Sequence, residues 1–230
     1  MAGRLIVVSG TGTGIGKTYL CEALLTALRT SGRRVVGLKP IETGLNDPAP
    51  SDALRLDRAS SFHVKQSSYR FADPVSPHIA AREAGQPILL GQITAEIATV
   101  RSDVDVVVVE LAGGLFTPLS DETVNAHLAR ALKPDALVLV VPDRLGALHE
   151  VLSTTLAARS LSVPIDGIVL MAPEQPDLST GRNAVELVRL KSTFWVTTLP
   201  RIAREELAMH PATTALATRL GAAGVTDAAL

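Results

Sequence analysis

Apolar residues in this chain fall into short runs that are separated by longer amphipathic stretches. One run, Val106–Val109, is apolar at successive positions instead of at every second position. Such a run is typical of a parallel strand that helices cover on both faces. Strands are therefore predicted over the runs that share this apolar, β-branched character: Leu5–Ser9, Arg34–Lys39, Asp105–Glu110, Ala136–Val141, Gly167–Met171 and Phe194–Thr197.

The stretches between these runs have helical spacing. Helices are predicted over Lys17–Thr30, Ser51–Ser60, Pro77–Ala84, Gln92–Arg101, Glu122–Leu132, Leu145–Leu161, Arg182–Lys191 and Ala203–Leu220. Strand–helix alternation along the whole chain predicts an α/β fold with one mostly parallel central sheet of about six to seven strands and helices on both faces.

The domain organisation is predicted to be simple. No internal repeat is found, and the segments Asn46–Pro50 and Pro173–Asp177 are typical of loops instead of linkers. Residues 1–230 are therefore predicted to form a single domain. The last residues, Gly221–Leu230, are rich in small side chains and are predicted to be a flexible tail.

Composition narrows the functional classes. The chain has 230 residues, a formal net charge of −1 and no long basic run, which argues against nucleic acid as a partner. No stretch approaches the ~20 apolar residues of a membrane span, and no signal peptide is recognised, so we expect no membrane association and a cytoplasmic location. The single cysteine, Cys21, fits a reducing compartment, and its place on a helix favours a role in the core.

Residues Gly10–Thr18 read GTGTGIGKT and follow the apolar run Leu5–Ser9 directly. Strand, glycine-rich turn, then lysine and threonine opening a helix is the order of a phosphate-binding loop. Lys17 can reach the outer phosphates, and the Thr18 hydroxyl can ligate magnesium. Five residues separate Gly10 from Gly16, one more than the common pattern has. The fold is thus predicted to be phosphate-loop NTPase-like.

A dinucleotide-binding dehydrogenase is a rival interpretation of these glycines. Short-chain dehydrogenases need a tyrosine four residues before a lysine, but Tyr19 and Tyr69 are followed at that spacing by Ala23 and Asp73. The second strand also ends in Lys39 instead of a ribose-binding acid. The dehydrogenase interpretation is therefore disfavoured.

The residues at the ends of the predicted strands matter because ligands bind at the carboxyl edge of such sheets. Lys39 could neutralise charge on a transferring phosphoryl group, or could be an ordinary surface lysine. Glu110 ends a buried strand and needs a cation, either magnesium or a salt-bridge partner. Asp52 could contribute to the site, or Ser51 or Asp52 could simply cap the following helix.

Six motifs in order resemble the dethiobiotin synthetase family: GTGTGIGKT, LKPIETG, SDALRL, SPHIAA, VVVELAGGLFTPLSD and the LG that opens a helix at Gly146. The resemblance runs from Leu5 to about Leu161. It implies a homodimeric ligase of biotin biosynthesis that uses 7,8-diaminononanoate, carbon dioxide (CO2), a nucleoside triphosphate such as ATP, and magnesium (Mg2+). A carbamate and a carbamic–phosphoric anhydride precede ring closure.

The resemblance also implies roles for individual residues. Catalytic positions are Thr13, Lys17 and Lys39, and the magnesium positions are Thr18, Asp52 and Glu110. Nucleotide-binding positions are Gly14, Ile15, Gly16, Lys17, Thr18, Asp52, Glu110, Gly113 and Pro200. Substrate-binding positions are Thr13, Lys39, Thr43 and, for the substrate carboxylate from across the dimer, Gly146, Ala147 and Leu148.

The sequence departs from the family pattern at two places. Leu111 stands where a glycine is usual, and Met171 stands where an asparagine usually reads adenine. The second departure predicts that triphosphates other than ATP are accepted. His78, which follows Pro77 at a helix start, is interpreted as structural instead of as a catalytic base.

A nucleotide-dependent switch or partitioning protein of the same superfamily is the alternative function. Those proteins commonly carry an extra lysine early in the loop, and positions 10–15 hold none. Cobyric acid synthases share the loop, but they normally append an amidotransferase domain with a nucleophilic cysteine, whereas the cysteine here is Cys21.

Overall fold

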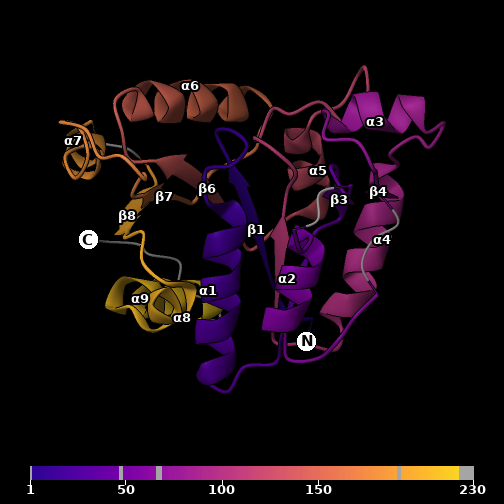
Figure 1. Ribbon diagram of the computed structural model, residues 1–230, viewed down its shortest axis with the longest axis horizontal. Coiled ribbons are helices and arrows are strands. Elements are labelled where there is room, and N and C mark those ends of the chain that lie inside the picture. Colours follow the sequence, from indigo (N-terminus) through magenta and orange to yellow (C-terminus); the bar gives the residue numbers. More distant parts are fainter. Residues whose placement is uncertain (1, 47–48, 66–68, 191–192, 223–230) are drawn as a thin grey trace.

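The computed structural model describes residues 2–46, 49–65, 69–190 and 193–222. A parallel six-stranded sheet in the order β2-β5-β1-β6-β7-β8 forms its centre (Figure 1). The strands are β1 (Arg4–Gly10), β2 (Val35–Leu38), β5 (Val106–Glu110), β6 (Ala136–Pro142), β7 (Gly167–Met171) and β8 (Trp195–Leu199). The prediction of one parallel α/β sheet is confirmed.

Helices cover both faces of the sheet because alternate strand residues point to opposite sides. Ile6 and Val8 belong to one core cluster, with residues of α1 (Lys17–Thr30), α2 (Asp52–Ala59), α8 (Arg204–Met209) and α9 (Pro211–Gly221). Leu5 and Val7 belong to the other, with α3 (Pro77–Glu83), α4 (Leu90–Arg101), α5 (Asn125–Leu132), α6 (Ala147–Ser160) and α7 (Asn183–Arg189). Cys21 is buried in the first cluster, as predicted.

Aspartates fix the strand register at the amino edge of the sheet. Asp135 directly precedes β6 and accepts a hydrogen bond from Leu5 N at 2.7 Å, and Asp166 precedes β7 and accepts one from Leu137 N at 2.7 Å. Asp105, before β5, accepts from Arg34 N at 2.8 Å. Each carboxylate satisfies a backbone donor at the start of a neighbouring strand or just before it, which helps to fix the register of the sheet.

Two predicted helices differ from the structure by more than two residues. The predicted helix Ala203–Leu220 is wrong as a single element, because His210 is extended (ψ 137°) and separates α8 from α9. The following Pro211 disfavours helical backbone at His210. The predicted start at Glu122 is also wrong: a turn in which Leu119 N donates to Thr123 O occupies this segment, and α5 begins at Asn125.

Smaller differences lie at the chain's short elements. The pattern did not predict β3 (Ile41–Glu42) and β4 (Tyr69–Arg70), which form a separate two-stranded parallel sheet. Residues 47–48 of the predicted loop Asn46–Pro50, Lys191 of the predicted helix, and residues 223–230 of the predicted tail lie outside the described residues. Within the described ranges, no helix has the length and apolar character needed to cross a membrane.

Candidate active site

The phosphate loop connects β1 to α1 at the carboxyl edge of the sheet. Gly16, the residue before α1, has φ +99°, a left-handed conformation that glycine adopts without strain. Gly114, in the loop after β5, approaches so closely that a Cβ atom there would lie 3.2 Å from the Thr11 carbonyl carbon. Leu115 N also donates to Gly10 O at 2.9 Å. The two loops therefore form one surface.

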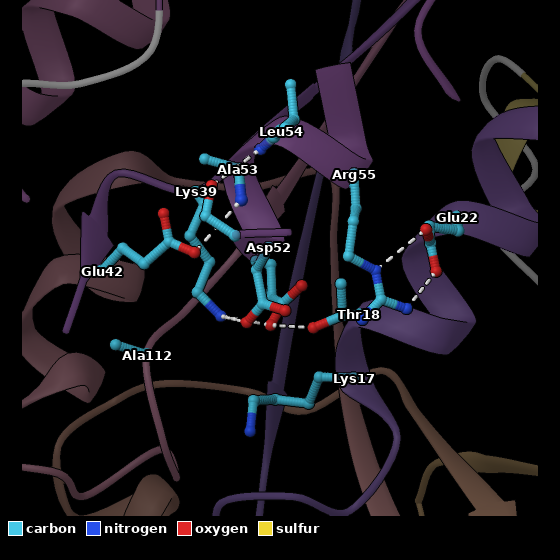
Figure 2. Close-up of polar contacts among 12 residues, drawn as sticks. Lys17, Thr18, Glu22, Lys39, Glu42, Asp52, Ala53, Leu54, Arg55 and Ala112 are labelled. Atoms are coloured by element: carbon cyan, nitrogen blue, oxygen red, sulfur yellow. Dashed lines mark hydrogen bonds and ion pairs between the residues drawn. The ribbon is translucent and has the colours of Figure 1, made fainter. Parts of the chain in front are cut away.

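Lys17 is buried at the first position of α1. Its ammonium donates to Gly12 O at 2.7 Å, so the side chain arches back over its own loop. Figure 2 shows it pointing away from Lys39 and Asp52. Burial lowers the pKa of Lys17 to about 8, although the negative charge of Glu110 partly opposes this effect.

Lys39, directly after β2, lies at the centre of a cluster of charges. Its Nζ is 2.5 Å from Glu110 Oε1 and 2.7 Å from Asp52 Oδ2, and only 6% of its side chain is exposed (Figure 2). Burial by itself would lower the pKa of Lys39, but the two carboxylates outweigh burial and raise that pKa. Of the two interpretations of Lys39, the surface lysine is therefore wrong.

The two carboxylates of the cluster differ in burial. Glu110 is 1% exposed, and its Oε1 also accepts a hydrogen bond from Thr18 Oγ1 at 3.0 Å. Asp52 is half-buried; burial raises its pKa, but the positive charge of Lys39 outweighs burial and holds the pKa below its usual range. Ser51 is the helix cap of α2, since its Oγ accepts from Leu54 N at 3.3 Å, which leaves Asp52 available to the site.

The cluster holds an acceptor that its neighbours do not use. Glu110 Oε2 is buried and has no hydrogen-bond partner among the described residues. Together with Thr18 Oγ1 and the Asp52 carboxylate, it gives a set of oxygen donors of the kind that magnesium prefers. Among the described residues, this cluster included, no group of three or more histidine, cysteine, aspartate or glutamate side chains is arranged to hold a metal ion; the cluster itself supplies two carboxylates.

The loop after β5 explains how the chain accommodates Leu111. Leu111 is 1% exposed and packs in the core cluster of α4 and α5, while its backbone N–H donates to Val8 O at 2.9 Å. Asn125, also buried, donates from Nδ2 to Ala112 O and Gly114 O. The leucine therefore fills the core, while Gly114 in the same loop packs against the phosphate loop.

A cavity of about 460 Å3 lies beside the phosphate loop. Its lining residues come from the loop, α1, the end of β7, the segments after β7 and β8, and the start of α8: Gly14, Ile15, Gly16, Tyr19, Met171, Ala172, Arg201, Ile202, Ala203, Arg204 and Glu205. Arg201 pairs with Glu174, and Arg204 pairs with Glu22. The cavity is thus lined by apolar residues on one side and by charged residues on the other.

Known proteins match most of the chain. A family model described as an AAA domain matches residues 4–211. A protein of Nitrosospira multiformis named ATP-dependent dethiobiotin synthetase BioD is 38% identical over 170 residues, covering 73% of this chain and 75% of the relative. A protein of the same name from Ralstonia nicotianae is 36% identical over 206 residues, covering 86% and 90%. The chain belongs to the dethiobiotin synthetase family.

Solved structures with low identity share the fold of this dethiobiotin synthetase family member. The septum site-determining protein MinD from Pyrococcus horikoshii, complexed with Mg-ADP, aligns with TM-score 0.57 and 16% identity over 95% of this chain and 94% of that one. A ParA family ATPase from Chlorobium tepidum aligns with TM-score 0.56 and 14% identity over 95% and 92%. At this identity the likeness concerns the fold alone.

The structure places many of the predicted site residues in the charged cluster, along the cavity, or in the loop after β5. Thr18, Lys39, Asp52 and Glu110 meet in the charged cluster, with Lys17 beside it on the same loop. Gly14, Ile15 and Gly16 line the cavity; Pro200 directly precedes its lining residue Arg201, and Gly113 lies in the loop that packs against the phosphate loop.

The remaining predicted residues lie around these groups. Thr13 is exposed on the phosphate loop, and Thr43 is half-buried beyond β3. Gly146 caps α6 with φ +95°, followed by buried Ala147 and half-buried Leu148. His78 contacts Ser76, whose Oγ lies 3.0 Å from its Nδ1, next to the start of α3.

Sequence reasoning missed several polar residues around the site. Glu22 accepts two hydrogen bonds from the Arg55 guanidinium, which ties α1 to α2 to one side of the charged cluster (Figure 2). Glu150, on α6, accepts from Thr11 Oγ1 of the phosphate loop at 2.6 Å. In the sequence, a helical glutamate that makes a tertiary contact looks the same as one that faces solvent. The sequence pattern therefore gave no signal for Glu22 or Glu150.

Proposed function

We propose that this protein is an ATP-dependent dethiobiotin synthetase, which closes a cyclic urea from 7,8-diaminononanoate, carbon dioxide and ATP. The observation that carries this proposal is the meeting of Thr18, Lys39, Asp52 and Glu110 beside a phosphate loop, in a member of this family. The curated relatives favour this ligase over a nucleotide-dependent switch.

The phosphate loop binds the triphosphate. Its backbone N–H groups and the amino terminus of α1 favour an anion, and Lys17 supplies a cation. The Lys17 ammonium, which now donates to Gly12 O, turns toward the outer phosphates when they are bound. The pKa of Lys17 is only about 8 without phosphates, so bound phosphates also stabilise the protonated form of this lysine.

Thr18, Asp52 and Glu110 would hold magnesium. The buried and unpartnered Glu110 Oε2 supports this assignment, since an orphaned carboxylate oxygen is costly unless a cation or a donor satisfies it. When bound, the ion neutralises phosphate charge and orients the triphosphate. Lys39 pairs with both carboxylates, so it compensates one of their two negative charges before the ion binds.

The proposed reaction has three steps. One amino group of the diamine adds to carbon dioxide and releases a proton, giving a carbamate. A carbamate oxygen attacks the γ-phosphorus, ADP leaves, and a carbamic–phosphoric anhydride forms. The second amino group attacks the carbonyl carbon, inorganic phosphate leaves, and a proton is released as the ring closes. Lys39 and Lys17 stabilise the charge that develops on the transferring group, and Thr13 contacts the carbamate.

The rest of the substrate is assigned to the second subunit of a homodimer. Thr43 touches the diamine, and Gly146, Ala147 and Leu148 of the partner receive the substrate carboxylate at the amino terminus of α6. The exposed apolar residues Leu152 and Leu156 on α6 support a dimer, since large apolar residues on a helix surface favour burial. We also propose a cytoplasmic location, in keeping with the thiol of Cys21.

The choice of nucleotide follows from the cavity. Met171, where the family pattern usually has an asparagine, offers the base an apolar contact, and apolar contacts discriminate by only ~1–3 kcal/mol. We therefore expect CTP, GTP and UTP to replace ATP with modest loss. Turnover with each triphosphate at equal magnesium tests this; a preference for ATP by several orders of magnitude would mean that Arg201, Arg204 or backbone groups read adenine.

One assay tests the proposed function itself. The purified protein is incubated with the diamine, bicarbonate, magnesium and ATP, and dethiobiotin is sought by mass spectrometry together with stoichiometric ADP and phosphate. Reactions without the diamine or with Lys39→Ala are the controls. Hydrolysis of ATP that does not depend on the diamine, with no dethiobiotin, would contradict the proposal.

A further inference from the structure

Glu150 joins α6 to the phosphate loop. It lies in the first turn of α6, where its N–H donates to Gly146 O at 3.0 Å. Its Oε2 accepts from Thr11 Oγ1 at 2.6 Å, and its Oε1 accepts from Arg144 Nη2 at 2.9 Å. One carboxylate thus contacts the first residue of the phosphate loop and the turn that opens α6.

The carboxylate of Glu150 suits the first turn of a helix, but it also faces the phosphate loop. The side chain is only 25% exposed, and it lies against a loop built to hold anions. An uncompensated carboxylate there would repel a triphosphate. The Arg144 guanidinium, 49% exposed, supplies the compensating charge. Arg144 also donates from Nη1 to Leu145 O at 3.2 Å, so the guanidinium stays over the turn.

The turn that carries Arg144 is itself held in place. Asp143, 4% exposed, accepts from Asn183 Nδ2 at 2.7 Å and from Gly181 N at 2.8 Å. Asp177 accepts from Leu145 N at 2.7 Å. Both carboxylates tie residues 143–145 to the segment before α7 and to its first residue, so the position of Arg144 is set by these contacts as well as by its exposed ion pair.

We propose that Glu150 is a positioning residue that couples the nucleotide to the substrate, and that Arg144 cancels its charge at the phosphate loop. The proposal rests on the proposed function, in which the start of α6 receives the substrate carboxylate. The path runs from Arg144 through Glu150 to Thr11, and then to Gly12, whose carbonyl holds the Lys17 ammonium. Side-chain contacts link Arg144, Glu150 and Thr11, and the backbone carries the link from Thr11 to Gly12.

Two consequences can be measured separately. The first is electrostatic: Glu150 is harmless to nucleotide binding only while Arg144 is present. The second is coupling: a bound nucleotide that fixes Thr11 also fixes the first turn of α6, so nucleotide and diamine each raise the affinity for the other by the same factor.

The electrostatic consequence is tested by the binding of a non-hydrolysable ATP analogue with magnesium, measured by calorimetry. Arg144→Gln should weaken binding about three- to fivefold at low ionic strength, and the loss should shrink at high salt. The double variant Arg144→Gln/Glu150→Gln should bind within about twofold of wild type, because neutral glutamine still accepts from Thr11. Glu186→Gln, which breaks the exposed pair of Glu186 with Arg189 on α7, is the matched control.

The coupling is tested by the affinity for the diamine with and without the analogue. Wild type should bind the diamine more tightly when the analogue is present, and Glu150→Ala should bring that ratio close to one while Glu150→Gln retains most of it. Thermal unfolding of each variant separates this effect from a loss of folded protein.

The outcomes are decisive for each part. If Arg144→Gln binds the analogue like wild type, or if the double variant fails to recover, charge compensation is wrong. If wild type shows no coupling, or Glu150→Ala keeps it, the positioning role is wrong. Failure of the wild-type protein to bind the diamine or to form dethiobiotin would overturn the proposed function instead, and the nucleotide measurements would still judge the Arg144–Glu150 pair.

Discussion

The two lysines of the site have opposite electrostatic settings. Lys39 has two carboxylates within 2.7 Å, and its pKa is raised, so it is charged at every physiological pH. Lys17 donates to a neutral carbonyl, and burial lowers its pKa to about 8. Protonated Lys17 therefore costs stability below pH about 8, and this cost disappears as the pH rises toward the ordinary value of 10.5.

Binding of nucleotide should reverse the shift at Lys17. Phosphates favour the charged lysine, so its pKa should rise and the protein should take up a proton when magnesium-bound analogue binds at about pH 8.5. Calorimetry in two buffers of different ionisation enthalpy measures that proton. Lys17→Arg, whose guanidinium is always charged, should show no uptake. Equal uptake by both proteins would locate the proton elsewhere.

Removal of Lys39 should affect both catalysis and folding. Lys39→Ala leaves Glu110 buried without its cation, a type of change that costs about 3–5 kcal/mol of stability, and it also abolishes turnover. Magnesium should restore more stability to Lys39→Ala than to wild type, because it can neutralise the same carboxylates. Chemical unfolding with and without magnesium checks this. An unchanged unfolding free energy would show that Lys39 does not stabilise the pair.

Strands β7 and β8 depend on a residue with no side chain. Gly167 opposes Trp195 in register, and a Cβ atom at Gly167 would lie 2.1 Å from the indole ring. Gly167→Ala should therefore lower the unfolding free energy by about 1–3 kcal/mol. Denaturant unfolding measures this, and the cost should be smaller in a Trp195→Val background.

A matched glycine distinguishes crowding from a general effect of the substitution. Gly91, within α4, has no neighbour within 4 Å of a Cβ position, so Gly91→Ala should be neutral or slightly stabilising. Loss of stability that is equal in Gly167→Ala and Gly91→Ala would contradict the packing argument.

The helices and strands were largely predictable because each long element carries its own period. The apolar run Val106–Val109 predicts a buried parallel strand wherever it lies in the sheet. β3 and β4 have two residues each, too few to show a period. The break at His210 depends on the effect of Pro211 on its neighbour, which the helical spacing of the flanking residues conceals.

The site was predictable only in part. Lys39 and Glu110 could be found because charged residues at the ends of apolar strands are conspicuous, but their contact across 71 positions depends on the strand order. Glu150 could not be found, since its partner Thr11 is 139 residues away and nothing around either residue marks the contact. Residues whose role depends on a tertiary contact cannot be recognised from the pattern of a single sequence.

Helices cover the sheet on both faces, and within the described residues α6 and α7 expose several large apolar side chains. We define the α6–α7 face by Leu152, Leu156, Val185 and Val188, which are 45–71% exposed. α6 and α7 contact one another, so these side chains belong to neighbouring surfaces on the same side of the sheet (Figure 1). The start of α6, proposed to receive the partner's substrate, lies at one end of this face.

The proposed homodimer predicts that this face is buried against a second copy. Wild type should have twice the chain mass of 24.1 kDa in analytical ultracentrifugation, and Leu152→Glu/Leu156→Glu should sediment as a monomer. The monomer should bind nucleotide normally, because the phosphate loop is complete in one chain, but should lose dethiobiotin formation. Met209→Glu, at a 67% exposed position on the opposite face of the sheet, should remain dimeric and active. A monomeric wild type with full turnover would show that catalysis does not need a second subunit. A double variant that stays dimeric would show that the interface lies elsewhere.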